Sequence, residues 1–527
     1  MVSLQEFLFD SPISRTKLLK YHPIHEVKHN IQVYRNHSFE LIEHTIRPYL
    51  DYAGFQANFS YSDYDDSLSF FHIEEPCDLF ILWLDLSRYH SNNIHDFLKQ
   101  RIDVLKGKIS CPILVVSIPN DLELSSPITC LPLKKIREEL GERFYDFRME
   151  PFSGTKLSAS ACEKIAKELG LRYLPALLEP SIKAIAVDLD NTLYHGILGE
   201  DGIDNLELTE GHKLLQQELK CLSKKGIFLG AVSKNDENDV KKMFSQRTDF
   251  PLQLEDFTAV YASWNEKSKS LEQFAKYLNI HPDSMVFLDD NIGELSSVHR
   301  QIPEIRLLHA YHDAKNTLKV LTYFPGLLRL HSRKEDTFRK KDTQANSIRH
   351  SLKESMSEEE YLKNLQIVLS FHLNVPSEAG RIAELSNKTN QFIFNYKRYS
   401  EQQVSSLMSD PNTSVISVSL QDRLSNSGII AAFFAKKDTE NVVLEEGFVS
   451  CRALGRGLED YIIQGSIQYL LEHFHANQLK IMFQKGERNV PAEKYIHCSL
   501  ANYLESPQSF SYKLSNNFIT TLFQKEK

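Results

Sequence analysis

The sequence predicts an α/β protein built from three domains. Its 527 residues exceed what one hydrophobic core usually serves, because single domains commonly hold about 100–200 residues. Up to about residue 330, short aliphatic runs typical of buried strands alternate with amphipathic segments typical of helices, which predicts parallel sheets. Beyond a charged stretch, a last segment carries its own strand pattern. We therefore expect domains at 1–175, 176–330 and 361–527, with 331–360 as a helical connector or, alternatively, a flexible linker.

Composition excludes several classes of protein. The hydrophobic fraction of 42% and the charged fraction of 25% are those of an ordinary globular protein. A net charge of -9 argues against general nucleic-acid binding, and no apolar run approaches the roughly 20 residues of a membrane span. The 7 cysteines are scattered without a Cys-x-x-Cys pair, which favours free thiols in a reducing compartment. Since the amino terminus also lacks a basic leader-like segment, we expect a soluble, cytoplasmic protein.

The amino-terminal domain is expected to contain a parallel sheet. Its strand candidates are Ile31–Tyr34, Cys77–Leu84 and Pro112–Ser117, and its helix candidates are Phe39–Tyr52 and Ser158–Leu169. The arrangement resembles an SGNH-hydrolase-like fold, in which Ser38 would lie near the nucleophile position. Pro175 and Pro180 then suggest a short rigid linker to the second domain.

Ser38 lacks the sequence context of a catalytic serine. The chain has no Gly-Asp-Ser block, and Gly154–Ser158 stands where the SGNH-like family has Asp-x-x-His. A serine without a histidine partner has no base to activate it. We therefore expect a non-catalytic domain that serves recognition or assembly. Asp146 and Arg148 are equally compatible with a structural ion pair.

Two carboxylates follow the first strand candidate of the second domain. Asp188 and Asp190 come directly after the apolar run Lys183–Val187. Strand alternation predicts that both point the same way, so that they share a divalent cation or divide the roles of nucleophile and general acid. A loop without catalytic function is the alternative, because Asp-x-Asp pairs are common. Gly196–Ile203 is typical of a glycine-hinged flap over such a site.

Three further motifs strengthen the catalytic interpretation. Ser233 follows the strand candidate Ile227–Val232, and its hydroxyl is suited to bind a phosphate oxygen. Lys267 opens a helix and would neutralise a phosphoryl group, although an ordinary surface lysine is the alternative. Asp289 and Asp290 follow a third apolar run. One such coincidence is weak, whereas four in this order indicate a single site.

The order of these motifs resembles the haloacid dehalogenase superfamily. The resemblance implies that Asp188 attacks phosphorus and forms an aspartyl phosphate, whereas Asp190 protonates the leaving group and later activates water. It implies an Mg²⁺ site made by Asp188, the main-chain carbonyl of Asp190 and Asp289, with Asp290 as the competing ligand. The motif serine and lysine would hold the phosphoryl group.

The third domain combines strands with a turn suited to phosphate. Its strand candidates are Ile367–Phe371, Val415–Ser419, Ile429–Phe434 and Val442–Leu444. Arg452, Gly455 and Gly457 precede a helix, and the glycines would let backbone amides approach a pyrophosphate. The pattern resembles the coenzyme A loop of GNAT acyltransferases, and Asn489 opens a segment similar to their asparagine segment. Coenzyme A or a phosphopantetheine arm is the implied ligand.

Together these parts resemble the FkbH-like proteins, which join a haloacid dehalogenase-type domain to a GNAT-like domain. The resemblance covers roughly residues 180–500 and is carried by Asp188–Leu193, Gly199–Gly202, Ser233–Asp236, Phe287–Asn291, Lys388–Phe392 and Ser450–Gly457. Tyr194 and His195 stand where the family has Trp-Gly or a similar pair, which bears on the substrate pocket. The amino-terminal domain accompanies the family in some members.

The FkbH-like resemblance implies acyl transfer in polyketide-type biosynthesis. 1,3-Bisphosphoglycerate would lose phosphate, and its glyceryl group would reach the phosphopantetheine thiol of an acyl carrier protein. Cys451 would act as a transient acyl acceptor if Arg452, Arg456 or the following helix terminus stabilised its thiolate, the alternative being a small buried thiol.

A basic patch and two other functions complete the expectations. Lys388, Lys397 and Arg398 suggest a landing patch for an acidic carrier protein. The first alternative function is a phosphomonoesterase of a small metabolite or phosphorylated carrier, with a separate acyl transfer in the third domain. The second is a scaffold for carrier proteins whose carboxylates merely bind Mg²⁺. Asp188 and Asp190 count against the scaffold, because a nucleophile is needed only where something is attacked.

Overall fold

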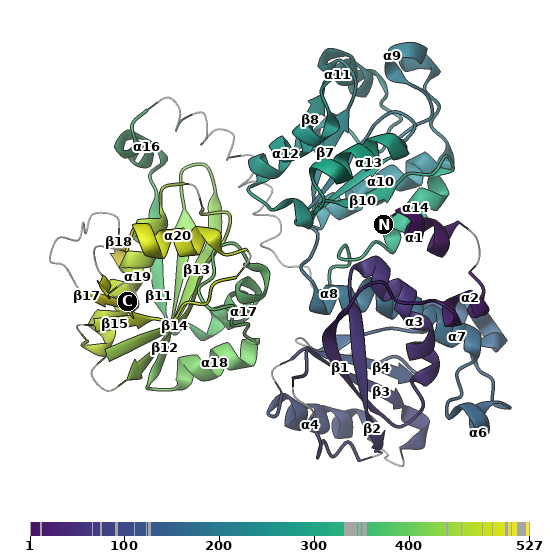
Figure 1. Cartoon of the computed structure of the whole chain (residues 1–527), viewed down its shortest axis with the longest axis horizontal. Coiled ribbons are helices and arrows are strands. Elements are labelled where there is room, and N and C mark those ends of the chain that lie inside the picture. Colours follow the sequence, from purple (N-terminus) through teal and green to yellow (C-terminus); the bar gives the residue numbers. More distant parts are fainter. Residues whose placement is uncertain are drawn as a thin grey trace. The chain divides into compact units, whose positions relative to one another are not determined.

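The chain forms two compact units, each with its own apolar core (Figure 1). The computed structural model describes residues 2–330 except 11–12, 66, 74–75, 90–92, 110, 123 and 125–127, the separate residues 345, 349 and 352, and residues 356–525 except 439–440, 455, 477, 487, 501–503, 507–508 and 514–522. The first unit contains the described residues within 1–274 and 281–332, and the second unit contains those within 275–280 and 333–527. The predicted connector at 331–360 lies mostly outside the described residues.

The amino-terminal half of the first unit is built on a parallel sheet, as predicted. The strand order is β2-β1-β3-β4-β5, with β1 Val27–Arg35, β2 Gln56–Tyr64, β3 Leu79–Asp85, β4 Ile113–Ile118 and β5 Thr129–Cys130. β3 and β4 are buried along their whole length, which explains their continuous apolar sequences. The sequence did not predict β2, because polar residues fill it and only its first residue is buried.

Helices accompany this sheet, and the last of them contains Pro175, the first of the two predicted linker prolines. The helices of this half are α1 Val2–Phe9, α2 Arg15–Leu19, α3 Glu40–Ala53, α4 Ile94–Lys106, α5 Lys134–Leu140, α6 Glu150–Ser153, α7 Ala159–Glu168 and α8 Leu174–Leu178. A π-helical turn at Leu169–Tyr173 joins α7 to α8. Pro175 is accommodated because it lies in the first turn of α8, where a missing N–H costs no helical hydrogen bond.

The second half of the first unit contains another parallel sheet. Its order is β10-β9-β6-β7-β8, with β6 Ala184–Val187, β7 Phe228–Ser233, β8 Ala259–Ala262, β9 Met285–Asp289 and β10 Arg306–His309. Its helices are α9 Leu198–Asp201, α10 Glu210–Lys224, α11 Glu237–Gln246, α12 Lys267–Leu278, α13 Ile292–Gln301 and α14 Ala314–Thr322. The three predicted strands are the buried inner ones, β6, β7 and β9, whereas the half-buried edge strands β8 and β10 were missed.

Both sheets of the first unit share one apolar core. The rings of Tyr52, on α3, and Phe324, just after α14, lie 5.9 Å apart between centroids. Gln5 of α1 is buried and pairs with the main chain of His309, donating to its carbonyl at 2.8 Å and accepting from its N–H at 3.1 Å. The amino-terminal helix thereby satisfies polar groups of the edge strand β10.

The second unit is a mixed sheet with helices. Its strand order is β16-β17-β15-β14-β13-β12-β11-β18, with β11 Val368–Leu373, β12 Thr413–Gln421, β13 Asn426–Asp438, β14 Asn441–Val449, β15 Gln478–Ile481, β16 Leu504–Ser506, β17 Ser509–Lys513 and β18 Phe523–Lys525. The helices with described bounds are α16 Glu358–Leu365, α17 Ala379–Lys388, α18 Glu401–Ser409, α19 Glu459–Phe474 and α20 Val490–Cys498. β11 to β14 pair antiparallel, whereas β14 and β15, joined through α19, pair parallel. None of the helices in the described part of the chain has the length and apolar character required to cross a membrane.

His212, on α10, makes the first unit sensitive to acid. Its side chain is fully buried, and its Nδ1 lies 2.8 Å from the Thr209 hydroxyl. The centroids of the His212 and His195 rings are 4.5 Å apart. Burial lowers the pKa of His212 to about 4, and the nearby imidazoles of His195 and His312 act in the same direction. Below an unfolded-state pKa of about 6.5, the unfolded chain therefore binds a proton that the folded chain refuses.

Replacing His212 should reduce the loss of stability in acid. Between pH 6.5 and 4 this histidine lowers the free energy of unfolding progressively, by about 2 kcal/mol at pH 5. In His212→Gln, the difference in unfolding free energy between pH 7 and pH 5 should shrink by about that amount. Urea unfolding at both pH values measures it, with the exposed His299→Gln as control. Equal acid sensitivity in His212→Gln and the native chain would contradict the assignment.

Candidate active site at the carboxyl edge of the second sheet

The topology of the second sheet gathers the predicted motifs at one edge. β6 lies between β7 and β9, and all three run parallel. Asp188 therefore follows the central strand, with Ser233 at the end of β7 on one side and Asp289 at the end of β9 on the other. Lys267 is the first residue of α12, which comes after β8. Carboxyl ends of parallel strands at such a crossover are the usual place for a ligand site.

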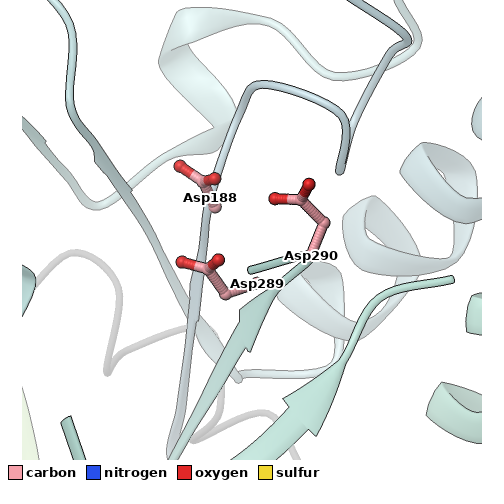
Figure 2. Close-up of side chains that lie close together, drawn as sticks. All are labelled: Asp188, Asp289 and Asp290. Carbon is pink, nitrogen blue, oxygen red and sulfur yellow. The ribbon is translucent and has the colours of Figure 1, made fainter. Parts of the chain in front are cut away.

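Three carboxylates form a compact cluster at this edge. Asp188, Asp289 and Asp290 each offer an oxygen atom, and these atoms lie within 4.8 Å of one another (Figure 2). Asp289 is fully buried and Asp188 is 5% exposed. The Oδ1 atom of Asp188 is buried without a hydrogen-bond partner, although a carboxylate oxygen in such a place needs one. An all-oxygen donor set of three carboxylates fits Mg²⁺.

Lys267 is a buried site residue, which excludes the alternative of an ordinary surface lysine. Its side chain is 6% exposed, and its Nζ lies 3.0 Å from Asp188 Oδ2 and 2.6 Å from Asp289 Oδ2. One ammonium therefore compensates two buried carboxylates from the same side. The arrangement leaves Asp188 Oδ1 uncommitted, while Oδ2 is held in place.

The electrostatics of the cluster favour a further cation. Burial is the largest cause that raises the pKa of Asp188, and the negative charge of Asp289 is the second. Together they raise this pKa to about 7, although the positive charge of Lys267 lowers it. Burial also raises the pKa of Asp289, and burial together with Asp188 raises that of Asp290. The pKa of Lys267 lies above its usual value, because the two carboxylates outweigh the effect of burial. A divalent cation would relieve the repulsion among these acids.

The Asp190 side chain is not part of the carboxylate cluster, contrary to the prediction that it points the same way as Asp188. Its Oδ1 accepts hydrogen bonds from the Tyr194 hydroxyl at 2.7 Å and the Leu198 N–H at 3.0 Å. Strand alternation does not apply here, because β6 ends at Val187 and the chain then turns, with Asn191 at a φ of 53°. The side chain of Asp190 is therefore held apart from the three carboxylates, and its main-chain carbonyl stays the predicted metal ligand.

Asn235 connects Asp190 to Ser233 and was missed by sequence reasoning. Its Nδ2 donates to Asp190 Oδ2 at 2.7 Å and to Ser233 Oγ at 2.9 Å, and it is 2% exposed. A serine hydroxyl that accepts this bond keeps its own hydrogen for another acceptor, such as a phosphoryl oxygen. Asn235 follows Ser233 by two residues, and this spacing is the sequence signal that could have identified it as a site residue.

The predicted flap contacts Asp190 directly. α9 lies within it, and the bond from the Leu198 N–H to Asp190 fixes the start of this helix against the site. Gly196 and Gly202 have φ values of 110° and 75°, which only glycine adopts readily. His195 exchanges main-chain hydrogen bonds with Glu207, each 2.9 Å long, which closes the base of the flap.

The turn before α19 carries the other predicted site. Cys451 is partly buried, and Gly457 has a φ of 76°, whereas Gly455 lies outside the described residues. Nη1 of Arg456 lies 3.6 Å from the buried carboxylate of Asp422. Acidic residues, Glu459 and Asp460, occupy the first turn of α19. These carboxylates already complement the helix dipole and would repel a phosphate. The glycine pattern therefore favours the predicted pyrophosphate site, whereas the charges at the start of α19 do not.

Asn489 does not face a ligand surface, which corrects its predicted contact with a cofactor. The side chain is fully buried, and its amide donates to the carbonyls of Ile393 at 3.0 Å and Gln484 at 2.9 Å. Its oxygen accepts from the Gly486 N–H at 2.9 Å. Asn489 therefore ties its own loop to the backbone at Ile393, a role that the segment's sequence did not distinguish from ligand binding.

Two of the three cations in the predicted landing patch for a carrier protein pair with carboxylates of the second unit. Lys388 pairs with Glu384 at 2.5 Å, and Lys397 pairs with Glu445 at 3.2 Å. Arg398 donates to the carbonyl of Thr389 at 2.8 Å. Paired charges of this kind attract an acidic partner less than the sequence suggested.

Ser38 has an acidic partner and no imidazole among its described hydrogen bonds. Its hydroxyl donates to Glu40 at 2.5 Å, while the adjacent His37 is buried with Nδ1 2.9 Å from the Thr155 hydroxyl. That Ser38 is not an activated nucleophile stays a prediction. Asp146 and Arg148 lie 3.5 Å apart as an ion pair in which Arg148 is exposed and Asp146 is partly buried.

Comparison with known proteins yields only distant likenesses. No family model and no curated protein matches the chain. Among solved structures, the N-terminal part of BF1531 from Bacteroides fragilis, described as containing a phosphatase domain complexed with Mg, shows 18% identity and a TM-score of 0.46 over 59% of this chain and 98% of that chain. A haloacid dehalogenase-like hydrolase from Streptococcus pneumoniae shows 16% identity and a TM-score of 0.21, with 27% and 91% covered. A variant of spermidine N-acetyltransferase from Vibrio cholerae shows 12% identity and a TM-score of 0.18, with 22% and 69% covered. These values are too low to assign the chain to a family.

Proposed function

We propose that the second sheet carries a haloacid dehalogenase-type phosphoryl-transfer site, with Asp188 as the nucleophile. The observation that carries this proposal is the asymmetry of the Asp188 carboxylate. One oxygen is held by Lys267, and the other is buried without a partner beside the carboxylates of Asp289 and Asp290. A carboxylate that only stabilised the fold would have both oxygens satisfied. The free oxygen is suited to attack phosphorus.

The residues of the site divide the reaction between them. Asp188 Oδ1 attacks phosphorus and displaces the leaving oxygen, forming an aspartyl phosphate, while the ammonium of Lys267 and the hydroxyl of Ser233 hold the phosphoryl oxygens. Asp190 gives its proton to the leaving oxygen and then accepts one from the water that releases inorganic phosphate. Mg²⁺, held by Asp188, Asp289 or Asp290 and, by family resemblance, the Asp190 main-chain carbonyl, would screen the phosphate charge.

We further propose that the substrate is an activated three-carbon acid: Asp188 removes its ester phosphate, and the acceptor thiol attacks the acyl phosphate carbonyl, which releases inorganic phosphate and passes the acyl group to an acyl carrier protein. The motifs shared with FkbH-like proteins support this substrate, 1,3-bisphosphoglycerate, and the phosphopantetheine thiol as acceptor. Cys451, in the turn before α19, is the candidate transient acyl acceptor. Phosphomonoester hydrolysis remains the second candidate, because the Asp188 site is sufficient for it without the second unit.

Carrier loading separates the candidate functions. In the presence of Mg²⁺ and 1,3-bisphosphoglycerate, the purified protein should add a glyceryl group to one holo carrier protein of a panel. The mass of each carrier measures this addition.

Trp264 is 75% exposed between β8 and α12, and an exposed tryptophan is typical of a binding hot spot. Trp264→Ala should reduce loading by roughly tenfold without affecting phosphate release from a small ester. Phe71→Ala, which removes another exposed aromatic side chain from the amino-terminal half of the first unit, is the control.

Each remaining outcome of that experiment has one meaning. Phosphate release without a mass gain on any holo carrier would contradict acyl transfer and support the phosphomonoesterase. Carrier binding without phosphate release would support the scaffold and overturn the proposed phosphoryl transfer.

Asn235 should matter most for substrates whose leaving group needs a proton. Asn235→Ala removes the amide that positions both Asp190 and Ser233, so phosphate release from an alkyl phosphate should fall about 10–100-fold. With a p-nitrophenyl ester, whose leaving group needs little protonation, the fall should be several times smaller. Asn238→Ala, on the exposed face of α11, is the matched control. Equal losses for both substrates would indicate a merely structural role.

A further inference from the structure

Two of the free thiols lie in contact at the amino-terminal edge of the first sheet. The Sγ atoms of Cys77 and Cys111 are 3.7 Å apart, and both side chains are partly buried. Cys77 lies just before β3 and Cys111 just before β4, which are neighbouring parallel strands. This edge is opposite the carboxyl end where Ser38 lies, so the pair belongs to neither candidate site.

The backbone around the two cysteines suits a disulfide. Phe80 of β3 is in register with Ile113 of β4, and the Phe80 N–H donates to the Pro112 carbonyl at 3.0 Å. Continued to the cysteines, this register places Cys111 one residue beyond the position opposite Cys77, so strands about 4.8 Å apart with a rise of about 3.3 Å per residue give a Cα separation of about 5.8 Å, within the range of about 4.4–6.8 Å that a disulfide spans. The sulfur atoms must approach by about 1.7 Å to reach a bond length of about 2.05 Å, a shift that side-chain rotation supplies.

A metal site explains this pair less well than redox chemistry does. Structural zinc takes four ligands, and two sulfur atoms provide half of them. Among the described residues, only Asp188, Asp289 and Asp290 form a group of three or more metal-binding side chains. The two thiols therefore lack the further ligands that a metal would require.

We propose that Cys77 and Cys111 are a reversible oxidation site that forms an intramolecular disulfide when the protein meets a peroxide. The sulfur of Cys77 attacks one peroxide oxygen and becomes a sulfenic acid, releasing one water molecule. The sulfur of Cys111 then attacks the Cys77 sulfur, and the sulfenic oxygen leaves as a second water molecule with the remaining thiol proton. Two thiols and one hydrogen peroxide thus give one disulfide and two waters.

The hydrogen bonding of the pair supports this order of attack. Cys111 donates to Cys77, while Cys77 also lies 3.3 Å from the Leu79 carbonyl. The hydrogen bond from Cys111 lowers the pKa of Cys77, and the same contact with burial raises that of Cys111. A thiol that ionises more readily is the better first nucleophile toward a peroxide.

Peptide mapping of the full-length protein tests the proposal. Folded protein is treated with hydrogen peroxide, its remaining thiols are alkylated, and the digest is weighed with and without dithiothreitol. The expected result is one cross-linked peptide pair joining Cys77 and Cys111 and lighter by two hydrogen atoms, which dithiothreitol separates. Cys77→Ser should abolish this pair. Cys130→Ser should retain it, because Cys130 pairs with Val115, about 13 Å along β4 from Cys111.

Three results would overturn the proposal. Cys77 and Cys111 could both remain fully alkylated at a peroxide dose that oxidises the exposed Cys498. Cys77 could stop at the sulfenic or sulfinic acid, or join another cysteine or a second molecule. Finally, the cross-link could form no faster in folded than in urea-unfolded protein, whereas the 3.7 Å contact requires faster formation in the folded state.

Discussion

Asp188→Asn should reduce phosphate release by about 10³-fold or more, because it removes the oxygen that attacks phosphorus while keeping the size of the side chain. Release of inorganic phosphate from a small phosphate ester in the presence of Mg²⁺ measures the effect. The native protein should also form a phosphorylated species that mass spectrometry locates at Asp188. No phosphorylated species should form in the variant.

The control for this prediction is an equally conservative change elsewhere in the same half. Asp239→Asn, on the exposed surface of α11, should leave phosphate release unchanged. Undiminished release by Asp188→Asn would remove the proposed nucleophile. Loss in both variants would indicate a general effect of charge rather than the chemistry of one carboxylate.

Lys267→Met should reduce both activity and stability. The variant leaves the carboxylates of Asp188 and Asp289 without the ammonium that lies 3.0 and 2.6 Å from them. Removing one partner of a buried ion pair costs about 3–5 kcal/mol of unfolding free energy. Urea unfolding in the presence of a chelator measures this cost.

Mg²⁺ should offset more of that loss in the variant than in the native protein. A divalent cation bound by Asp188, Asp289 and Asp290 would supply the missing positive charge, so Mg²⁺ should raise the unfolding free energy of Lys267→Met more strongly. Lys269→Met, at an exposed position two residues further along α12, should change neither stability nor its dependence on Mg²⁺. A Lys267→Met protein as stable as the native one would contradict the proposed charge balance of the site.

The sequence alone was sufficient to identify the strands that position the site. β6, β7 and β9 are buried on both faces, so their sequences are continuous aliphatic runs, and a polar motif follows each of them. Parallel pairing then brings the ends of such strands to one edge, which is why Asp188, Ser233 and Asp289 were all placed correctly at the same edge. Edge strands such as β8 carry no comparable signal, because half-burial tolerates mixed sequences.

Only the tertiary structure decided what the individual side chains do. Sequence spacing could not distinguish a buried Lys267 from a surface lysine, since its burial depends on packing against Asp188 and Asp289. It could not show that Asp190 turns to Asn235, because the turn after Val187 breaks strand alternation. The hydrogen bond from Asn489 to Ile393 and the contact between Cys77 and Cys111 likewise join segments that are distant in sequence. The sequence thus determined which chemical groups come to each sheet edge, whereas contacts between separate segments determined their partners and charges, because burial and hydrogen bonding arise only when those segments pack.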